Sequence, residues 1–407
     1  MPSSVSSRRL ITVAFLVFVA LGLSAGVLGV AWPSMRGDLS RPLSDLGVLL
    51  AISTGGYFLA GLVAGRLTDR IGIGNLLTAT MTLGTVSLVG YAVAQSWPLL
   101  LIASIGLGLT GGMIDSVINA YVALQHGTRT MNLLHASFGV GATVGPILVA
   151  STLARGLSWR SAFLILAGAE LVLLVTVAVV RGRWPVAAQE QESAVSQSHA
   201  GGSVLGLLGL FFLYVGLEFA AGQWSYSLLT EGRGVGEFIA GLWVAAYWGG
   251  LTGGRLVLGV LGDRVGSGTT LWLSMVGTIL GCALFWWDPA GLGVAGLPLA
   301  GVSLAGIFPT LVALTPSWVG KERAPTVIGY QIAASSVGAA SIPWIAGLVI
   351  ESAGLEALGP FLVATAILMA GLHLVVARSV GGRGQRRSMQ SRSPFSRATT
   401  DRNSSQS

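Results

Sequence analysis

Two stretches of the sequence share the pattern G-x-L-x-D-R-x-G: Gly65-Arg66-Leu67-Thr68-Asp69-Arg70-Ile71-Gly72 and Gly259-Val260-Leu261-Gly262-Asp263-Arg264-Val265-Gly266. The second copy begins 194 residues after the first, which is close to half of the 407-residue chain. A shorter pattern repeats at nearly the same distance, because Gly141-Ala142 with Pro146 matches Gly338-Ala339 with Pro343. Two repeats at almost one offset predict a chain built from two related halves.

The composition around these repeats is that of a membrane protein. Apolar residues make up 53% of the chain, charged residues only 10%, and the mean hydropathy is +0.76. A soluble domain carries about 25% charged residues. The 59 glycines fit the same class, because small residues let helices approach closely inside a bilayer. The single cysteine, Cys282, excludes a disulfide within the chain and a cysteine-based metal site.

Apolar runs long enough to cross a bilayer occur twelve times, since a spanning helix needs about 20 mostly apolar residues. The predicted spans are residues 10–32, 45–66, 74–95, 98–122, 132–154, 161–181, 204–229, 237–262, 268–287, 292–315, 326–350 and 357–378. The first run is too long for the apolar region of a signal peptide, so we interpret it as a span. The expected fold class is an all-α membrane protein with twelve transmembrane helices in two pseudo-symmetric six-helix bundles.

Basic residues are distributed unevenly between the two sides of this predicted membrane. With the N-terminus in the cytoplasm, seventeen Lys and Arg residues fall on the inner side and five on the outer side. Cytoplasmic loops carry the excess of Lys and Arg in membrane proteins. We therefore expect a multi-pass protein of the cytoplasmic (inner) cell membrane with both termini in the cytoplasm.

The longest hydrophilic stretch inside the chain divides it nearly in half. We expect an N-terminal six-helix bundle over residues 1–181, a cytoplasmic linker over 182–203 and a C-terminal six-helix bundle over 204–378. Residues 379–407 contain six arginines among Ser, Gly and Gln, so they are predicted to form a disordered basic cytoplasmic tail. Such a tail suits anionic lipid headgroups, and no nucleic-acid partner is expected.

The repeated loop follows the second and the eighth predicted span. Its glycines allow a tight turn, its aspartate can face the positive N-terminus of a helix, and its arginine stays at the headgroups. An aspartate bound in one conformation and released in another would act as a latch at the inner face, whereas the alternative is an ordinary charged turn. The expected gating residues are Gly65, Asp69, Arg70, Gly259, Asp263 and Arg264.

Twelve spans, a central linker and this loop after spans 2 and 8 resemble the major facilitator superfamily over residues 8–378. The resemblance implies two six-helix bundles around a central cavity, with alternating access through rocking of the two halves. It implies a secondary transporter that carries a small-molecule substrate across the lipid bilayer. We expect this transporter to work as a monomer.

Several polar residues lie inside the predicted spans, where an ionisable side chain is costly and indicates function. Asp115 and Asn119 lie four residues apart on one face of span 4, after the glycine-rich residues 108–112. Asn132 and His135 lie three residues apart on span 5. Together they predict a helix face that lines a polar cavity, with Asp115 as a proton carrier. The alternative is a hydrogen bond between helices that serves only packing.

A second polar group follows the middle of span 7, where Glu218 precedes Gln223 and Trp224. An amide and an aromatic ring suit a hydroxylated ligand, because a pocket needs a few polar groups to orient its ligand and an apolar wall to cover it. Trp224 could instead belong to the aromatic belt at the membrane surface. Arg255 in span 8 either pairs with an intramembrane acid or reaches the headgroups.

Spans 4, 5 and 7 also resemble the fucose permease-like branch of the superfamily. The motifs are Asp115-Ser116-x-x-Asn119-Ala120-Tyr121-Val122, Arg129-x-x-Asn132-Leu133-x-His135-x-x-Phe138-Gly139-x-Gly141-Ala142-x-x-Gly145-Pro146, and Glu218 with Gly222-Gln223-Trp224. This resemblance implies a proton-driven sugar symporter in which the acid of span 4 takes part in proton coupling and substrate binding. Asp115 stands where the fucose permease itself has Glu, so fucose does not follow as the substrate.

A different resemblance on span 5 points to export. Gly141-x-x-x-Gly145-Pro146 partly resembles the Gly-Pro motif of proton-coupled drug exporters, although Val149-Ala150 stands where that motif has a pair of glycines. A proton-coupled drug or metabolite exporter is therefore the alternative function. The sequence holds no nucleophile–base pairing, metal-binding His/Asp set or phosphate-binding loop, so no enzyme activity, cofactor or metal is expected.

The function expected from the sequence is proton-coupled uptake of a small polar solute such as a sugar. Asp115 and Glu218 are the expected proton-coupling residues. The expected substrate-binding residues are Asn119, Asn132, His135, Gln223 and Trp224. A receptor without transport is a further class, which net flux in vesicles would separate from a carrier.

Overall fold

The computed structural model describes residues 4–185, 202–288 and 291–391, almost all of them in helices. The first half holds α1 (Ser4–Ala25), α2 (Val27–Asp38), α3 (Asp45–Ile71), α4 (Ile73–Val93), α5 (Trp97–Gln125), α6 (Thr128–Leu153) and α7 (Trp159–Val180). The second half holds α8 (Gly202–Ser227), α9 (Glu237–Val265), α10 (Ser267–Trp287), α11 (Gly296–Leu304), α12 (Ile307–Val319), α13 (Ala324–Ala353) and α14 (Leu358–Ser391).

These fourteen helices make twelve membrane crossings, because two crossings are broken helices. Gly26 separates α1 from α2, and residues 305–306 separate α11 from α12. Eleven segments of the described chain are long and apolar enough to cross a membrane. The twelfth crossing is α9, whose 29 residues include two tryptophans, a tyrosine and Arg255 that lower its mean hydropathy. The predicted fold of twelve transmembrane helices is confirmed.

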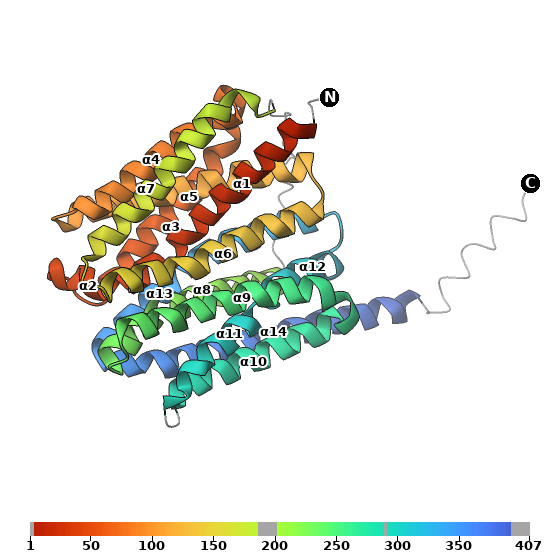
Figure 1. Ribbon diagram of the computed structural model, residues 1–407. Coiled ribbons are helices and arrows are strands. Elements are labelled where there is room, and N and C mark those ends of the chain that lie inside the picture. The colour runs from red at the N-terminus through yellow and green to blue at the C-terminus, as the bar shows by residue number, and fades with distance from the viewer. Residues whose placement is uncertain (1–3, 186–201, 289–290, 392–407) are drawn as a thin grey trace, which may run out of the picture.

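The two halves lie side by side as separate bundles, α1 to α7 in one and α8 to α14 in the other (Figure 1). The beginning of α1 and the end of α14 lie on the same side of the molecule (Figure 1). We call this end the motif face, because the helices α3 and α9, which carry the repeated loop sequence, also end there. The other end, where α2 leads into α3, is the opposite face.

Helix packing follows one scheme in both halves. The first crossing packs on the fifth, as α1 on α6 and α8 on α13. The second packs on the fourth, as α3 on α5 and α9 on α11, and the third packs on the sixth, as α4 on α7 and α10 on α14. The pseudo-symmetry predicted from the sequence repeats therefore extends to the arrangement of all twelve crossings.

The shorter sequence repeat marks one of these close contacts. A Cβ atom added to Gly141 would lie 2.0 Å from the carbonyl oxygen of Val19 on α1. At the equivalent place in the second half, a Cβ on Gly338 would lie 2.1 Å from the carbonyl oxygen of Phe212 on α8. Only glycine lets the two backbones meet so closely, which is how helices associate where no hydrophobic force drives them together.

The halves meet along the helices that carry both repeats. Across the interface α3 packs on α13, α6 packs on α9, and α2 packs on α8. The loop repeat therefore lies at the ends of α3 and α9, and the glycine repeat lies on α6 and α13. Each of these four helices contacts its own bundle and also the other half.

The segments between and after the bundles differ partly from expectation. The helix α14 continues to Ser391, although residues 379–407 were predicted to be disordered. Residues 379–391 contain no proline to stop a helix that already begins in the bundle. In the predicted linker 182–203, residues 186–201 lie outside the described residues, as do residues 392–407 of the tail.

Candidate functional site

Asp115 lies at the centre of a hydrogen-bonded group in the first half. The Tyr57 hydroxyl on α3 donates to Oδ2 of Asp115 over 2.6 Å. The Asn119 amide, one turn further along α5, donates to Oδ1 of Asp115 over 2.8 Å. All three side chains are half-buried. A carboxylate that accepts two hydrogen bonds at this depth is held in one orientation.

Glycines on α5 bring Tyr57 within reach of this carboxylate. A Cβ on Gly108 would lie 1.9 Å from the carbonyl oxygen of Ser53, and one on Gly112 would lie 2.1 Å from that of Tyr57. The glycine face of span 4 was expected to line a cavity. It packs instead against α3, because backbone contact between the two helices needs those positions free of side chains.

His135 on α6 links Asp115 to the second half. Its imidazole is exposed and meets the Phe18 ring edge-on, with 6.0 Å between the ring centroids. His135 lies one turn from Gly139, where α6 packs against Thr252 of α9. Asn132, also on α6, is exposed nearer the motif face, and the described residues give its side chain no hydrogen bond. The structure therefore brings Asp115, Asn119 and His135 together.

Glu218 and Arg255 form the corresponding group in the second half. The two side chains approach to 3.5 Å, between Oε2 of Glu218 and a terminal nitrogen of Arg255. The Arg255 guanidinium also donates to the Tyr214 hydroxyl over 3.3 Å, and the Tyr247 hydroxyl donates to the backbone carbonyl of Glu218 over 2.8 Å. Arg255 therefore pairs with an intramembrane acid rather than reaching the headgroups.

Gln223 and Trp224 are buried at the junction of the two halves. Gln223 donates over 2.8 Å to the carbonyl of Ala25, at the break between α1 and α2. Trp224 donates over 2.8 Å to the carbonyl of Pro343 on α13. Their side chains are at most 1% exposed. In this conformation both therefore join helices, and neither is accessible to a solute.

The opposite face is closed by further contacts between the halves. The Arg36 guanidinium, on α2, donates to both carboxylate oxygens of Glu231 over 2.8 and 2.9 Å. The Ser44 backbone amide donates over 2.9 Å to the Glu351 carboxylate. Apart from the Gln223 bond, these are the hydrogen bonds between the halves among the described residues. Among the described residues, the halves are thus hydrogen-bonded at the opposite face and have no hydrogen bond between them at the motif face.

The repeated loop of the first half borders a pocket of about 580 Å³ at the motif face. Asp69 and Arg181 both line this pocket. Gly65, Asp69 and Arg70 are exposed, and the described residues form no ion pair with Asp69. In the second copy Arg264 is exposed, while the surroundings of Gly259 and Asp263 lie outside what the structure describes. Among the described residues, Asp69 therefore has no ion-pair partner in the conformation whose opposite face is closed.

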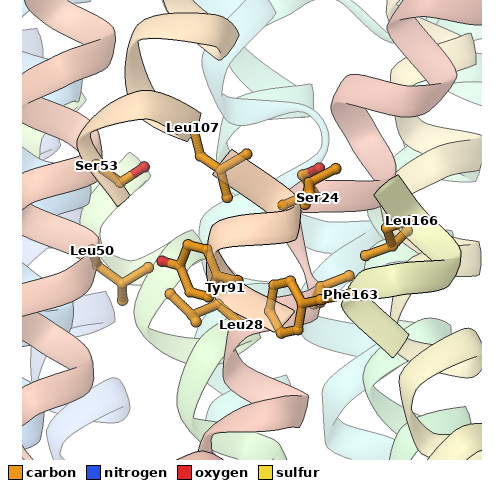
Figure 2. Close-up of a pocket in the computed structure, with 10 residues that line it drawn as sticks. Ser24, Leu28, Leu50, Ser53, Tyr91, Leu107, Phe163 and Leu166 are labelled. Atoms are coloured by element: carbon orange, nitrogen blue, oxygen red, sulfur yellow. The ribbon is translucent and has the colours of Figure 1, made fainter. Parts of the chain in front are cut away.

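A separate pocket lies inside the first half and is too small for a solute. Its volume is about 50 Å³, and Leu28, Leu50, Leu107, Phe163 and other mostly apolar side chains line it (Figure 2). A single water occupies about 30 Å³ of liquid volume, so the pocket has room for one or two. It is a packing gap beside the break in the first crossing.

Sequence reasoning missed the tyrosines of the site. Tyr57, Tyr214 and Tyr247 each bond or face one of the predicted acids, yet each lies singly in an apolar span. Two of them make a similar helix contact in the two halves. A Cβ on Gly301 would lie 2.2 Å from the carbonyl oxygen of Tyr247, as one on Gly112 lies against Tyr57.

Glu170 is a further buried acid, outside both groups. It is 6% exposed, lies against Gly84 on α4, and its Oε1 has no hydrogen-bond partner among the described residues. The described residues hold no cluster of three His, Cys, Asp or Glu side chains that could bind a metal ion. The candidate site thus has one charged group in each half, Asp115 with Tyr57 and Asn119 in the first and Glu218 with Arg255 in the second.

Known proteins share this fold and part of this sequence. The mouse (Mus musculus) sodium-dependent glucose transporter 1A is 25% identical over 82% of this chain and 88% of its own length. The 3-(3-hydroxy-phenyl)propionate transporter of Escherichia coli (strain K12) is 27% identical over 93% of this chain and 96% of its own. A solved bacterial homolog of the human lysosomal transporter Spinster superposes with a TM-score of 0.77 at 13% identity, covering 92% of this chain and 98% of its own.

These relatives are transporters rather than enzymes. The family model described as "Major Facilitator Superfamily" matches residues 14–287 and again residues 206–402, which together cover nearly the whole chain. This match agrees with the repeated twelve-crossing fold. It also agrees with the unequal charged groups near the place where the halves meet. The chain is a multi-pass membrane transporter and belongs to the Major Facilitator Superfamily.

Proposed function

We propose that this transporter takes up a small polar solute, such as a sugar, together with protons. The observation that carries the proposal is the half-buried Asp115 carboxylate inside a membrane span, held by hydrogen bonds from Tyr57 and Asn119. A charged carboxylate is costly in a low-dielectric interior, and protonation removes that cost. A carrier whose Asp115 binds a proton can therefore reorient more easily than one whose Asp115 is charged.

The other predicted residues take roles that follow from their positions. Glu218 would be the second proton-coupling residue, since it is buried beside Arg255. Asn119, Asn132 and His135 would bind the solute from the first half. Gln223 and Trp224 would reach it once the opposite face opens, because their present hydrogen bonds join helices across that closed region.

The loop aspartates would regulate which face is open. Within the part of the chain that the structure describes, Asp69 forms no ion pair while the opposite face is closed. On this proposal Asp69 and Asp263, with Arg70, Arg264, Gly65 and Gly259 around them, close the motif face in the other conformation. The motif face would be cytoplasmic, as the distribution of basic residues indicates, and the carrier would act as a monomer in the cytoplasmic membrane.

Two relatives support a polar solute in different ways. One is named for glucose and the other for a hydroxylated phenylpropionate. The name of the first also contains the word sodium-dependent, so a sodium gradient belongs in any test of coupling.

The alternative remains a proton-coupled exporter of drugs or metabolites. The motif behind it, Gly141 with Gly145, packs on the carbonyl oxygens of Val19 and Leu23. An importer and an exporter both need α6 to pack closely on α1, so this contact does not favour export over uptake.

The test is accumulation in proteoliposomes under an imposed gradient. We expect an inward pH gradient, and not a sodium gradient, to drive accumulation of at least one labelled solute from a set of sugars, polyols and hydroxy acids. The Asp115→Asn variant should lose this accumulation and keep exchange of solute, because a permanently neutral site still binds but no longer couples. Glu322→Gln, an exposed acid in a loop of the motif face, is the matched control and should behave as wild type. Full gradient-driven accumulation by Asp115→Asn would contradict the proposed role of Asp115.

A further inference from the structure

We propose, on the basis of the transport function proposed above, that Arg255 binds a carboxylate group of the transported solute. The substrate is then a small organic acid that also carries hydroxyl groups. Arg255 lies in the middle of α9, and a positive charge inside a membrane span is costly and indicates a function.

Arg255 lies at the point where the two halves begin to separate. A Cβ on Gly139 would lie 2.3 Å from Oγ1 of Thr252, so α6 and α9 touch there. His135 is one turn from Gly139 and Arg255 nearly one turn from Thr252, both towards the motif face. His135 is exposed and the Arg255 side chain is 35% exposed. A solute bound at this level contacts both halves.

The partners of Arg255 leave its guanidinium incompletely bonded. A guanidinium has five N–H donors, and the described residues accept one hydrogen bond from it, at 3.3 Å to the neutral Tyr214 hydroxyl. Its approach to Glu218 is 3.5 Å, longer than the about 2.7–2.9 Å of a charge-assisted bond. Oε2 of Glu218 is buried and has no hydrogen-bond partner among those residues. Arg255 and Glu218 therefore both have hydrogen-bonding capacity left for a third group.

A carboxylate fits this place better than a neutral hydroxyl group. The planar fork of arginine matches a carboxylate through two parallel hydrogen bonds, and each is stronger than a bond to a neutral group. On the facing side Asp115, Tyr57 and His135 supply acceptors and donors for hydroxyl groups. Arg255 thus binds one end of the substrate through its charge. The Asp115 group binds the other end through hydrogen bonds to hydroxyl groups.

The test compares acids with neutral counterparts in proteoliposomes under an inward pH gradient. The probes are D-gluconate and L-lactate, paired with D-glucose and 1,2-propanediol. We expect uptake of acid but not of its neutral counterpart. Arg255→Lys should raise the KM for the acid at least tenfold, because an ammonium keeps the charge and loses the fork. Arg183→Gln, an exposed arginine of the motif face, is the matched control and should leave the KM unchanged.

A double variant separates recognition from folding. Arg255→Gln alone would leave Glu218 without a cation, whereas Arg255→Gln with Glu218→Gln removes both charges together. This variant should purify as a folded protein and lose acid uptake. Acid uptake with an unchanged KM in the double variant would overturn the assignment. Uptake of the neutral solutes alone would overturn it and leave the transport proposal standing, while no uptake of any probe would count against both.

Discussion

At the scale of single residues, the candidate site consists of two unequal acids. Asp115 accepts two hydrogen bonds from neutral donors, whereas Glu218 approaches a cation at 3.5 Å and keeps one oxygen without a hydrogen-bond partner among the described residues. The two halves share a fold but not this chemistry. The difference gives each half a separate task, because the Asp115 group offers neutral donors and the Glu218 group offers a positive charge.

The Tyr57 hydroxyl is the residue-scale feature to test first. Tyr57→Phe removes the 2.6 Å hydrogen bond and leaves the ring, so only the orientation and solvation of Asp115 change. Hydrogen bonds to charged groups are worth about 1.5–3 kcal/mol, and 1.4 kcal/mol is a factor of about ten. We expect transport efficiency to fall at least tenfold in a vesicle assay.

Tyr330→Phe provides the control for that change. Tyr330 is 42% exposed, and the described residues form no hydrogen bond with its hydroxyl. Transport by this variant should match wild type. If Tyr57→Phe transported at the wild-type rate as well, the hydroxyl would not be needed to orient Asp115.

At the scale of helices, glycines and breaks decide how closely the elements meet. Backbone groups in a bilayer must find partners inside the protein. The break at Gly26 frees the carbonyl of Ala25, and the Gln223 amide from the other half bonds it. Gln223, which the sequence predicts to line the cavity, thus hydrogen-bonds the free carbonyl at the end of α1 in this conformation.

Gly338 gives a direct measure of helix contact. Gly338→Ala places a methyl group 2.1 Å from the carbonyl oxygen of Phe212, so α8 and α13 must move apart. Overpacking of this kind costs about 1–3 kcal/mol, and we expect a lower midpoint of thermal unfolding in detergent. Gly371→Ala on α14 is the control, since nothing lies within 4 Å of its added Cβ. It should be neutral or slightly stabilising, because alanine favours a helix. Equal midpoints for the two variants would contradict backbone contact at Gly338.

At the scale of the whole molecule, the described residues join the halves by hydrogen bonds at the opposite face and not at the motif face. Arg36 with Glu231 and Ser44 with Glu351 tie the opposite face, beside the contact of Gly47 with Trp344. The resemblance implies that each half moves as a body in alternating access, so we expect this face to open in the transport cycle.

A disulfide across the opposite face should stop transport. A Cβ on Gly47 would lie 2.9 Å from Cβ of Trp344, and small adjustments bring that to the 3.5–4.5 Å of a disulfide. In a Cys282→Ser background, we expect Gly47→Cys with Trp344→Cys to lose transport at least tenfold on oxidation. Dithiothreitol should restore it.

The matched control is a disulfide inside one half. A Cβ on Gly277 would lie 3.0 Å from Cβ of Ser303, and both residues belong to the second bundle. Gly277→Cys with Ser303→Cys should oxidise and still transport. Full transport by the oxidised pair across the halves would mean that the opposite face need not open.

The sequence by itself determined the membrane class, the twelve crossings and the two-half repeat. These follow from hydropathy, from the helix length needed to cross a bilayer and from the offset between Asp69 and Asp263. Each of these can be obtained from the sequence without knowing how the helices pack. Asn119 could be placed beside Asp115 for the same reason, because four residues make one turn.

Only the tertiary structure decided which residues from different helices share a site. Asp115 and Tyr57 are 58 residues apart, and Glu218 and Arg255 are 37 apart, so helical periodicity cannot relate them. The structure also decided that Gln223 and Trp224 join helices in this conformation, and that the glycines of span 4 pack rather than line a cavity. The physical reason is that helices become neighbours through close backbone contact. That contact depends on how whole helices pack and not on any local sequence pattern.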